Sequence, residues 1–263
     1  MTEARDPYAV LGDAYAIRRR PDPRIAGLIS AALGDARTVV NVGAGAGSYE
    51  PGDRRVAAVE PSPVMIRQRP AAAAPAVQGR AESLPFADQS FDAALAVLTV
   101  HHWASAPAGL AELRRVAGRQ LVLTWDQEIF AGFWLVRDYL PEIAEHERPL
   151  ACLAVVRAEL ARGRREVTTR DVPVPADCTD GFLGAYWRRP QAYLDPAIRA
   201  SMSGLALLDA GAVTAASRRL AADLASGRWH ARHGHLLGRL VAGGRVNLEL
   251  DLIGRLVARR PVR

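Results

Sequence analysis

One stretch of the chain limits most strongly what it can fold into: Val-Val-Asn-Val-Gly-Ala-Gly-Ala-Gly-Ser-Tyr, residues 39–49. An apolar run stops abruptly, and glycines follow at alternate positions, Gly43, Gly45 and Gly47. A short continuous apolar run is typical of a strand that is buried on both faces of a parallel sheet. Because glycine lets the backbone turn sharply and approach a ligand closely, the stretch predicts a buried strand that ends in a binding loop.

The spacing of these glycines separates two kinds of nucleotide-like ligand. Dinucleotide-binding loops follow the pattern G-x-G-x-x-G and open into a helix, whereas this chain has G-x-G-x-G. This spacing argues against a nicotinamide oxidoreductase, which ranks third among the functions considered in this section. The loop resembles the first motif of the class I S-adenosylmethionine (SAM) methyltransferases, whose glycines pass beneath the amino-acid part of SAM. The resemblance implies that Gly43, Ala44, Gly45 and Gly47 bind SAM.

A second apolar run, residues 56–60, ends in Glu60. A carboxylate at the end of such a strand can accept hydrogen bonds from both hydroxyls of a ribose. The alternative is a solvated acid at a strand end. Pro61 then leads into a helix where the resembled family places an apolar side chain beside adenine, which implies that Met65 lies there, although a methionine at such a place can equally be part of the core.

A third segment extends the resemblance to Trp103. Residues 79–92 resemble the segment that contacts the adenine edge, a role that falls to Ala81 and Glu82, and the apolar run at residues 93–100 follows as a fourth strand. The resemblance implies SAM as the cofactor, S-adenosyl-L-homocysteine as its product, and an α/β fold. That fold is a Rossmann-like seven-stranded sheet in the order 3-2-1-4-5-7-6, with an antiparallel last strand and helices on both faces.

The loop after the fourth strand contains the candidate catalytic residues. Open α/β sheets bind ligands at the carboxyl ends of their strands. The resemblance implies that Leu98 and Thr99 line the methionine arm of SAM and that the residues after them, up to Trp103, face the methyl acceptor. Histidine is a suitable base near neutral pH. Neighbouring side chains on an extended chain point to opposite faces, so His101 and His102 are not both expected to face the substrate, and we favour His102. A structural histidine is the alternative for either one.

The resemblance implies that residues 1–34, which precede the first strand, form helices that fold over the SAM pocket. Tyr15 and Arg19 could hydrogen-bond the carboxylate of SAM, because a guanidinium matches the two-pronged geometry of that group. The alternative is that the arginine triplet at residues 18–20 is a solvated face.

The chain departs from a minimal methyltransferase after the expected sixth strand, residues 166–174. Roughly seventy residues separate it from the expected final strand at 246–257, and an insertion of this size is more often functional than idle. We expect residues 35–174 to form the SAM-binding core, 175–245 a cap over the substrate, and 246–263 the final core strand. In the cap, Asp180 and Tyr186 are candidate catalytic residues. Asp177, Tyr186 and Trp187 are candidate substrate contacts, with turn-forming aspartates and core aromatics as the alternative.

Composition excludes several classes of function. The 263 residues are 49% hydrophobic and 24% charged, as in ordinary globular proteins. No apolar run of about 18 residues could span a membrane, and the N-terminus lacks a signal-peptide core, so we expect a cytoplasmic protein. All 34 basic residues are arginines, and they are scattered rather than gathered in a stripe, which argues against nucleic-acid binding despite the net charge of +6. Cys152 and Cys178 lack the spacing of a metal site, and no metal is expected.

The acceptor is expected to be a small molecule. The chain lacks the Asn/Asp-Pro-Pro-aromatic motif of amino-group DNA methyltransferases and the paired glutamates of protein arginine methyltransferases. As a whole it resembles a bacterial small-molecule family related to the ubiquinone and menaquinone C-methyltransferases. That resemblance implies C-methylation of a small aromatic or heteroaromatic metabolite, including an indole-type carbon, in secondary metabolism. The alternatives are O- or N-methylation and a SAM-binding regulatory protein without catalysis. The oligomeric state stays open.

Overall fold

The computed structural model describes residues 18–148, 153–163, 166–206, 208–239, 241–242 and 253–259. The chain divides into two compact units. The sheet unit comprises Pro23–Asp126, Leu150–Val172 and Gly254–Arg263, and the helical unit comprises Met1–Asp22, Gln127–Pro149 and Pro173–Ile253. Each unit is therefore built from segments that lie far apart in the sequence.

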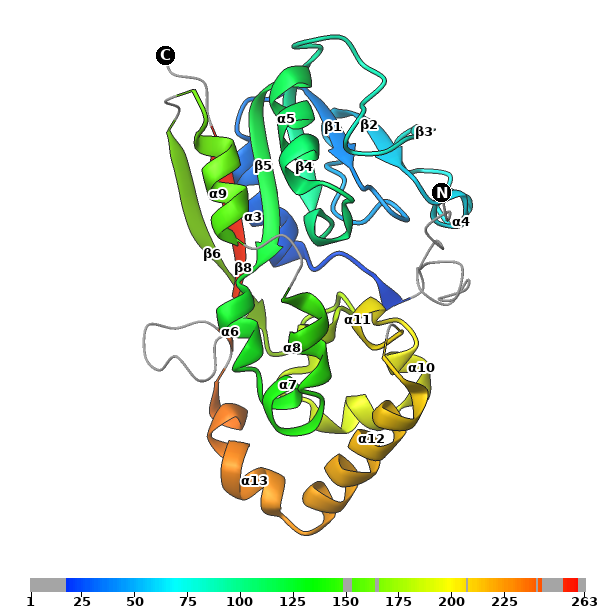
Figure 1. Ribbon diagram of the computed structural model, residues 1–263, viewed down its shortest axis with the longest axis vertical. Coiled ribbons are helices and arrows are strands. Elements are labelled where there is room, and N and C mark those ends of the chain that lie inside the picture. The colour runs from blue at the N-terminus through cyan, green and yellow to red at the C-terminus, as the bar shows by residue number, and fades with distance from the viewer. Residues whose placement is uncertain are drawn as a thin grey trace. The chain divides into compact units, whose positions relative to one another are not determined.

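The sheet follows the predicted Rossmann-like order. Its strands are β1 (Thr38–Val42), β2 (Arg55–Glu60), β3 (Ala76–Gln78), β4 (Phe91–Val97), β5 (Ala117–Trp125), β6 (Val167–Pro175), the two-residue β7 (Val241–Ala242) and β8 (Ile253–Arg259). They are ordered β3-β2-β1-β4-β5-β8-β6-β7 (Figure 1). The first five are parallel, and β8, the last long strand, pairs antiparallel with β5. Apart from the short edge strand β7, this is the expected order 3-2-1-4-5-7-6, with the antiparallel strand where it was predicted.

Two predicted strands differ at their ends. The fourth was expected to run to residue 100 but ends at Val97, because Leu98 takes a left-handed backbone conformation with φ of 52° and breaks the extended run. The final strand was expected at 246–257. The structure has β8 through residue 259, and the first part of the expected strand lies outside the described residues.

Helices cover both faces of the sheet. They are α3 (Pro23–Leu33), α4 (Pro63–Arg67), α5 (Ala106–Val116) and α9 (Leu153–Ala161). The α5 and α9 helices pack against each other and against β5, on the viewer's side of the strands in Figure 1, and α3 lies behind them. Parallel strands joined by such helices need apolar residues on both faces, and Val39, Val40 and Val42 of β1 are fully buried.

One carboxylate supports the pairing of β1 with β4. Asp92 at the start of β4 accepts hydrogen bonds from the backbone N–H groups of Arg37 and Thr38, each at 2.8 Å, and from the Thr38 hydroxyl at 2.9 Å. These backbone hydrogen bonds lower the pKa of Asp92. The Asp92 carboxylate of β4 is thus bound to the start of β1, its neighbour in the sheet.

The helical unit is built from short helices around an aromatic core. Its helices are α6 (Gln127–Ala131), α7 (Trp134–Tyr139), α8 (Glu142–Glu147), η2 (Leu183–Tyr186), η3 (Pro190–Leu194), α10 (Pro196–Arg199), α11 (Ser203–Ala206), α12 (Ala210–Ala225), α13 (Arg228–His233) and η4 (Gly234–Gly238). Trp134 and Trp229 are almost completely buried, and their rings meet edge to face with centroids 5.4 Å apart. Such pairs stabilise a core beyond the area that they bury.

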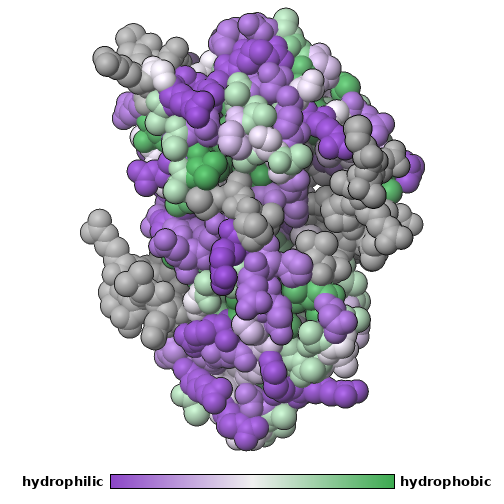
Figure 2. All heavy atoms as spheres, viewed as in Figure 1, coloured by the Kyte–Doolittle hydropathy of each residue, from purple (hydrophilic) through white to green (hydrophobic). Residues whose placement is uncertain are grey.

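Hydrophilic residues predominate on the face of the molecule that Figure 2 shows, and hydrophobic ones occur in small separate groups. Among the described residues, only Leu28 and Val77 are large hydrophobic side chains that are clearly exposed. No helix within the described ranges is both long and apolar enough to cross a membrane.

Candidate functional site

The glycine loop begins where β1 ends and is held by the neighbouring strand. The N–H groups of Gly43 and Ala44 both donate to the carbonyl of Val59 in β2, at 2.8 and 3.1 Å. Gly43, Gly45 and Gly47 have φ of 68°, 53° and 97°, a region that side-chain-bearing residues rarely adopt. The loop therefore depends on glycine for its conformation as well as for space.

Gly43 also lies against the turn that follows β4. A Cβ atom built on Gly43 would stand 2.0 Å from the Thr99 hydroxyl oxygen, which real atoms cannot do. Thr99 is itself buried. The carboxyl ends of β1 and β4 thus meet at these two residues, at the edge of the sheet where open α/β folds bind ligands.

Glu60, at the end of β2, is tied to the same loop. Its Oε2 accepts a hydrogen bond from the Gly45 N–H at 2.8 Å, and its Oε1 accepts one from the Ser62 N–H at 2.9 Å. Only 3% of Glu60 is exposed. The Glu60 carboxylate is therefore oriented by two backbone N–H groups, one in the glycine loop and one directly after Pro61.

Met65 closes the loop from the side of α4. The Ser62 hydroxyl caps this helix by accepting the Met65 N–H at 3.3 Å. The Met65 side chain is buried, and its terminal methyl would lie 3.4 Å from a Cβ on Gly45. An apolar side chain therefore lies next to the glycine loop, and the predicted place of Met65 beside adenine stays a prediction.

Ala81 and Glu82 lie in a loop that α5 holds in place. Ala81 is buried, and Oε1 of Glu82 accepts the N–H of Ser105, the N-cap residue of α5, at 3.0 Å. The carboxylate of Glu82 thus has a structural contact. Its predicted role at the adenine edge stays a prediction.

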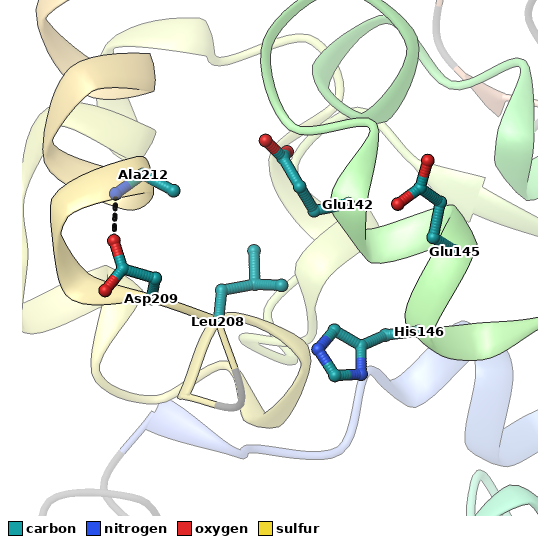
Figure 3. A pocket seen from close by; sticks show the side chains of 6 residues that line it. All are labelled: Glu142, Glu145, His146, Leu208, Asp209 and Ala212. Atoms are coloured by element: carbon teal, nitrogen blue, oxygen red, sulfur yellow. Dashed lines mark hydrogen bonds between the residues drawn. The ribbon is translucent and has the colours of Figure 1, made fainter.

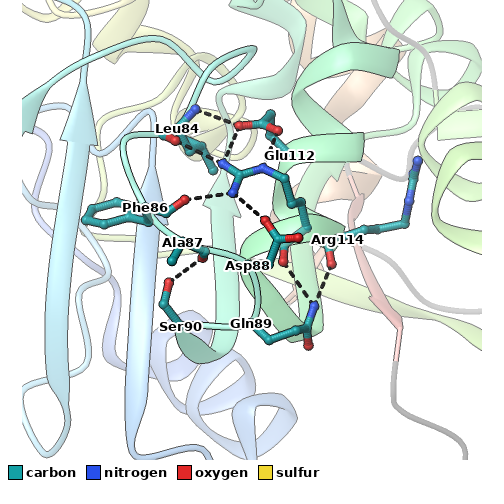
Figure 4. A network of polar contacts seen from close by, with 9 residues as sticks. Leu84, Phe86, Ala87, Asp88, Gln89, Ser90, Glu112 and Arg114 are labelled. Atoms are coloured by element: carbon teal, nitrogen blue, oxygen red, sulfur yellow. Dashed lines mark hydrogen bonds and ion pairs between the residues drawn. The ribbon is translucent and has the colours of Figure 1, made fainter.

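Arg115 of α5 holds the following residues, 84–90, in place through hydrogen bonds. Figure 4 shows this network around the labelled Leu84, Phe86 and Asp88. Its guanidinium donates to the carbonyls of Leu84 and Phe86 at 2.9 and 2.7 Å, and to Asp88 and Glu112. Glu112 in turn accepts the Leu84 N–H at 2.8 Å. The hydrogen bond from Arg115 holds the pKa of Glu112 below its usual range. This network fixes the loop that carries Ala81 and Glu82 onto α5.

The two histidines lie in a turn rather than on extended chain. Val100–His102 forms a short 3₁₀ helix, η1, in which the His102 N–H donates to the carbonyl of Thr99 at 2.8 Å. The imidazole rings of His101 and His102 are therefore close, with centroids 4.0 Å apart, and the expectation that they point to opposite faces of an extended segment is wrong. His102 is exposed and His101 is half-buried. The favoured role of His102 as base stays a prediction.

Trp103 packs into the sheet unit beside the same turn. A Cβ on Gly109 of α5 would lie 2.4 Å from the Trp103 ring, so the ring rests directly on that glycine. The ring borders the main hydrophobic core. Contact between Trp103 and a substrate stays a prediction.

The glycine loop, Glu60 and the turn after β4 all lie in residues 40–120, and these residues match the model of a methyltransferase domain family. Residues 40–120 therefore carry a methyltransferase domain. The match covers under a third of the chain, and the fold extends the likeness beyond it.

One solved structure resembles the methyltransferase over nearly its whole length. It is a protein from Anabaena variabilis described as a methyltransferase from an antibiotic biosynthesis pathway, with 29% identity, a TM-score of 0.83, and coverage of 92% of this chain and 98% of that one. YcgJ from Bacillus subtilis shares the fold at 17% identity and a TM-score of 0.54, over 92% of this chain and all of that one. Among curated sequences, the uncharacterized protein YafE of Escherichia coli is 45% identical over 49 residues, which are 18% of this chain and 24% of YafE. The matched stretch thus spans about a quarter of that relative.

Arg19 and Asp180, both in the helical unit, form an ion pair, although the sequence analysis gave them separate roles. Nε of Arg19 lies 2.6 Å from Oδ1 of Asp180, and the side chains are 12% and 0% exposed. The backbone supports the pair, because the Gly181 N–H donates to the carbonyl of Arg18 at 2.9 Å. Arg19 was predicted to bind the SAM carboxylate and Asp180 to act as a base. Both roles stay predictions. Tyr15 lies outside the described residues.

The other candidate residues of the cap differ in their surroundings. Trp187 is 2% exposed, and its indole N–H donates to the carbonyls of Val174 and Pro175 at 3.2 and 3.3 Å. Tyr186 is half-buried under the guanidinium of Arg189, 4.6 Å from its ring centre, and burial raises its pKa. Asp177 is exposed. Trp187 thus has a packing role, and the acceptor-binding roles of all three stay predictions.

A pocket of about 430 Å³ in the helical unit contains none of the residues predicted to be functional (Figure 3). It is lined by Glu142, Glu145, His146, Leu208, Asp209 and Ala212. The Asp209 carboxylate caps α12 by accepting the Ala212 N–H at 2.8 Å. Within the described part of the chain, no group of three or more His, Cys, Asp or Glu side chains is placed to hold a metal ion.

Sequence reasoning missed two charged residues beneath the glycine loop, Glu50 and Arg69. Their guanidinium and carboxylate groups are 2.7 Å apart and almost completely buried. The signal in the sequence is weak: Glu50 directly follows the loop, and Arg69 precedes an Ala/Pro-rich stretch.

Proposed function

We propose that this methyltransferase transfers the methyl group of SAM to a carbon atom of a small aromatic or heteroaromatic metabolite and releases S-adenosyl-L-homocysteine. The observation that carries the proposal is the contact between the Gly45 N–H and Glu60 Oε2 at 2.8 Å. It joins a glycine loop and an acid at the carboxyl ends of adjacent parallel strands, a place suited to a nucleoside with an amino-acid arm.

The residues present fit SAM. Glu60, as a carboxylate, would accept hydrogen bonds from the ribose hydroxyls, and Met65 would lie beside the adenine ring. Gly43, Ala44, Gly45 and Gly47 would present backbone to the amino-acid arm, because glycine lets the backbone approach a ligand closely. The remaining proposed contacts are those predicted from the sequence: Ala81 and Glu82 at adenine, Leu98 and Thr99 at the methionine arm, and Pro61, Tyr15 and Arg19.

SAM supplies a methyl group activated by a positively charged sulfur. The protein's main tasks are then to align donor and acceptor and to exclude water. An acceptor that must lose a proton also needs a base, which contributes about a hundredfold or more. We assign this role to His102, which would take a ring N–H or O–H proton as the acceptor carbon attacks. His101, Asp180 and Tyr186 are the other candidates.

The proposed class of methyl acceptor is supported by the similarity of this chain to a solved structure. The Anabaena variabilis protein is described as belonging to an antibiotic biosynthesis pathway, and it matches this chain over nearly its whole length. That supports a role in bacterial secondary metabolism for the present chain, with Trp103, Asp177, Tyr186 and Trp187 proposed to contact the acceptor. A cytoplasmic location and the absence of nucleic-acid partners are part of the same proposal.

The test is to incubate the protein with methyl-labelled SAM and extracts of its source organism, and then to find by mass spectrometry which compound gains the label. NMR of the product locates the methyl group. We expect label on an aromatic carbon. Label on nitrogen or oxygen would instead establish N- or O-methylation, and calorimetric binding of SAM with no labelled product from extracts or from an aromatic panel would favour a SAM-binding regulatory protein.

A further inference from the structure

We propose that the buried ion pair of Arg69 and Glu50 is a positioning device that holds the glycine loop in its SAM-binding conformation. The inference rests on the proposed function, because it concerns residues behind the loop rather than the residues that would touch SAM. Neither side chain is assigned a role by the motif that first marked this loop.

The pair connects three parts of the sheet unit that are separate in sequence. One guanidinium nitrogen of Arg69 lies 2.7 and 2.9 Å from the two carboxylate oxygens of Glu50 and 2.8 Å from the carbonyl of Ala74. Glu50 also accepts the Ala74 N–H at 3.0 Å and the side-chain amide of Asn41 in β1 at 3.3 Å. The end of β1, the residue after the loop and the segment after α4 are thus joined at one point.

The decisive contact is the one to the loop itself. The other guanidinium nitrogen of Arg69 donates to the carbonyl of Gly45 at 3.1 Å. The N–H of the same residue donates to Glu60. Gly45 is therefore fixed from both sides of its backbone, by Arg69 through its carbonyl and by Glu60 through its N–H.

A loop with three glycines needs such support. Glycine has more conformational freedom than any other residue, so an unsupported loop would populate many conformations and lose affinity in adopting one of them. Arginine suits the task because its planar group of donors can contact several acceptors at once, whereas lysine offers a single point charge.

Burial of the pair argues for a geometric rather than a purely stabilising role. The side chains of Arg69 and Glu50 are 6% and 8% exposed. The cost of removing both charges from water offsets much of their attraction, so a buried ion pair contributes little net stability while it still fixes geometry. The pair also lies next to Gly47, because a Cβ there would be in van der Waals contact with Arg69 at 3.4 Å and with Glu50 at 3.5 Å.

The experiment compares Arg69→Met and Arg69→Lys with a matched control, Arg54→Met. Arg54 is also a nearly buried arginine of the sheet unit, and it donates to the carbonyls of Ala36 and Ser30, but none of its hydrogen bonds reaches the loop. Two quantities are measured on the intact protein: amide hydrogen exchange of residues 43–47 without SAM, and the Kd for SAM by calorimetry. The Lys variant keeps a positive charge in place, so it serves if the Met variant does not fold.

We expect exchange of the 43–47 amides to rise about tenfold or more in both Arg69 variants, and the Kd for SAM to rise by about the same factor. In the Arg54 variant, neither the exchange of the 43–47 amides nor the Kd for SAM should change, even if its melting temperature differs from that of the wild type. Unchanged loop exchange in the Arg69 variants would overturn the proposal, as would an equal rise in the Arg54 variant. If the wild-type protein does not bind SAM, the proposed function fails, while the exchange data still decide whether Arg69 holds the loop.

Discussion

The N–H of Gly45 and the Oε2 atom of Glu60 are joined by a hydrogen bond of 2.8 Å, which links the glycine loop after β1 to the acid that ends β2. Gly45 follows β1 and Glu60 ends β2, the adjacent parallel strand, so their contact places the backbone of the glycine loop beside a carboxylate. The proposed SAM site is built outward from this contact.

Gly43→Ala should abolish SAM binding and destabilise the protein. The new Cβ would stand 2.0 Å from the Thr99 hydroxyl, and φ of 68° is strained for alanine. We expect a loss of about 2–4 kcal/mol in the free energy of unfolding, measured by denaturant titration. Gly52→Ala is the control, because nothing lies within 4 Å of its Cβ position. Normal stability and SAM affinity in the Gly43 variant would contradict this geometry.

His102→Ala should reduce kcat without weakening SAM binding. A positioned base contributes about a hundredfold or more, so kcat with the acceptor found in the labelling screen should fall by at least that factor. His101→Ala, in the half-buried neighbour whose ring lies 4.0 Å away, is the comparison. Full turnover by the His102 variant, or a larger loss in the His101 variant, would remove His102 as the base.

Local patterns predicted β1 and β2, because each is an apolar run whose end is marked by glycine or an acid, whereas the order of the strands was implied by the family resemblance. β1 and β2 end at the expected loop and at Glu60. The turn after β4 was not predicted, since nothing in the sequence shows that Leu98 would adopt a positive φ.

The sequence did not predict the two buried ion pairs, for a different reason. Arg19 and Asp180 are 161 residues apart in sequence. Arg69 and Glu50 meet only because the fold brings the segment after α4 next to the loop after β1. Charged residues in loops carry no periodicity that reveals a partner. The sequence therefore predicted which backbone forms the candidate site better than which side chains hold that backbone in place.

Glu112→Gln should destabilise the protein near neutral pH and have little effect in acid. The pKa of Glu112 is lowered in the folded state by the hydrogen bond from Arg115, so its stabilising contribution is present above the unfolded pKa of about 4.3 and is lost as pH falls through the folded pKa. We expect the melting temperature to fall by about 2–4 °C at pH 7. Thermal unfolding from pH 3 to 8 measures this, and a difference between the two proteins that does not shrink toward pH 3 would show that the charge of Glu112 is not responsible.

Calorimetric titration of SAM into the wild-type protein and into the Glu60→Gln variant tests the central claim most directly. Hydrogen bonds to a charged group are worth about 1.5–3 kcal/mol, so the wild-type protein should bind SAM and the variant should bind it about 10–100-fold more weakly. Asp53→Asn, which changes an exposed acid of the same unit, should bind like the wild type. No binding of SAM by the wild-type protein, or equal affinity in the Glu60 variant, would contradict the account.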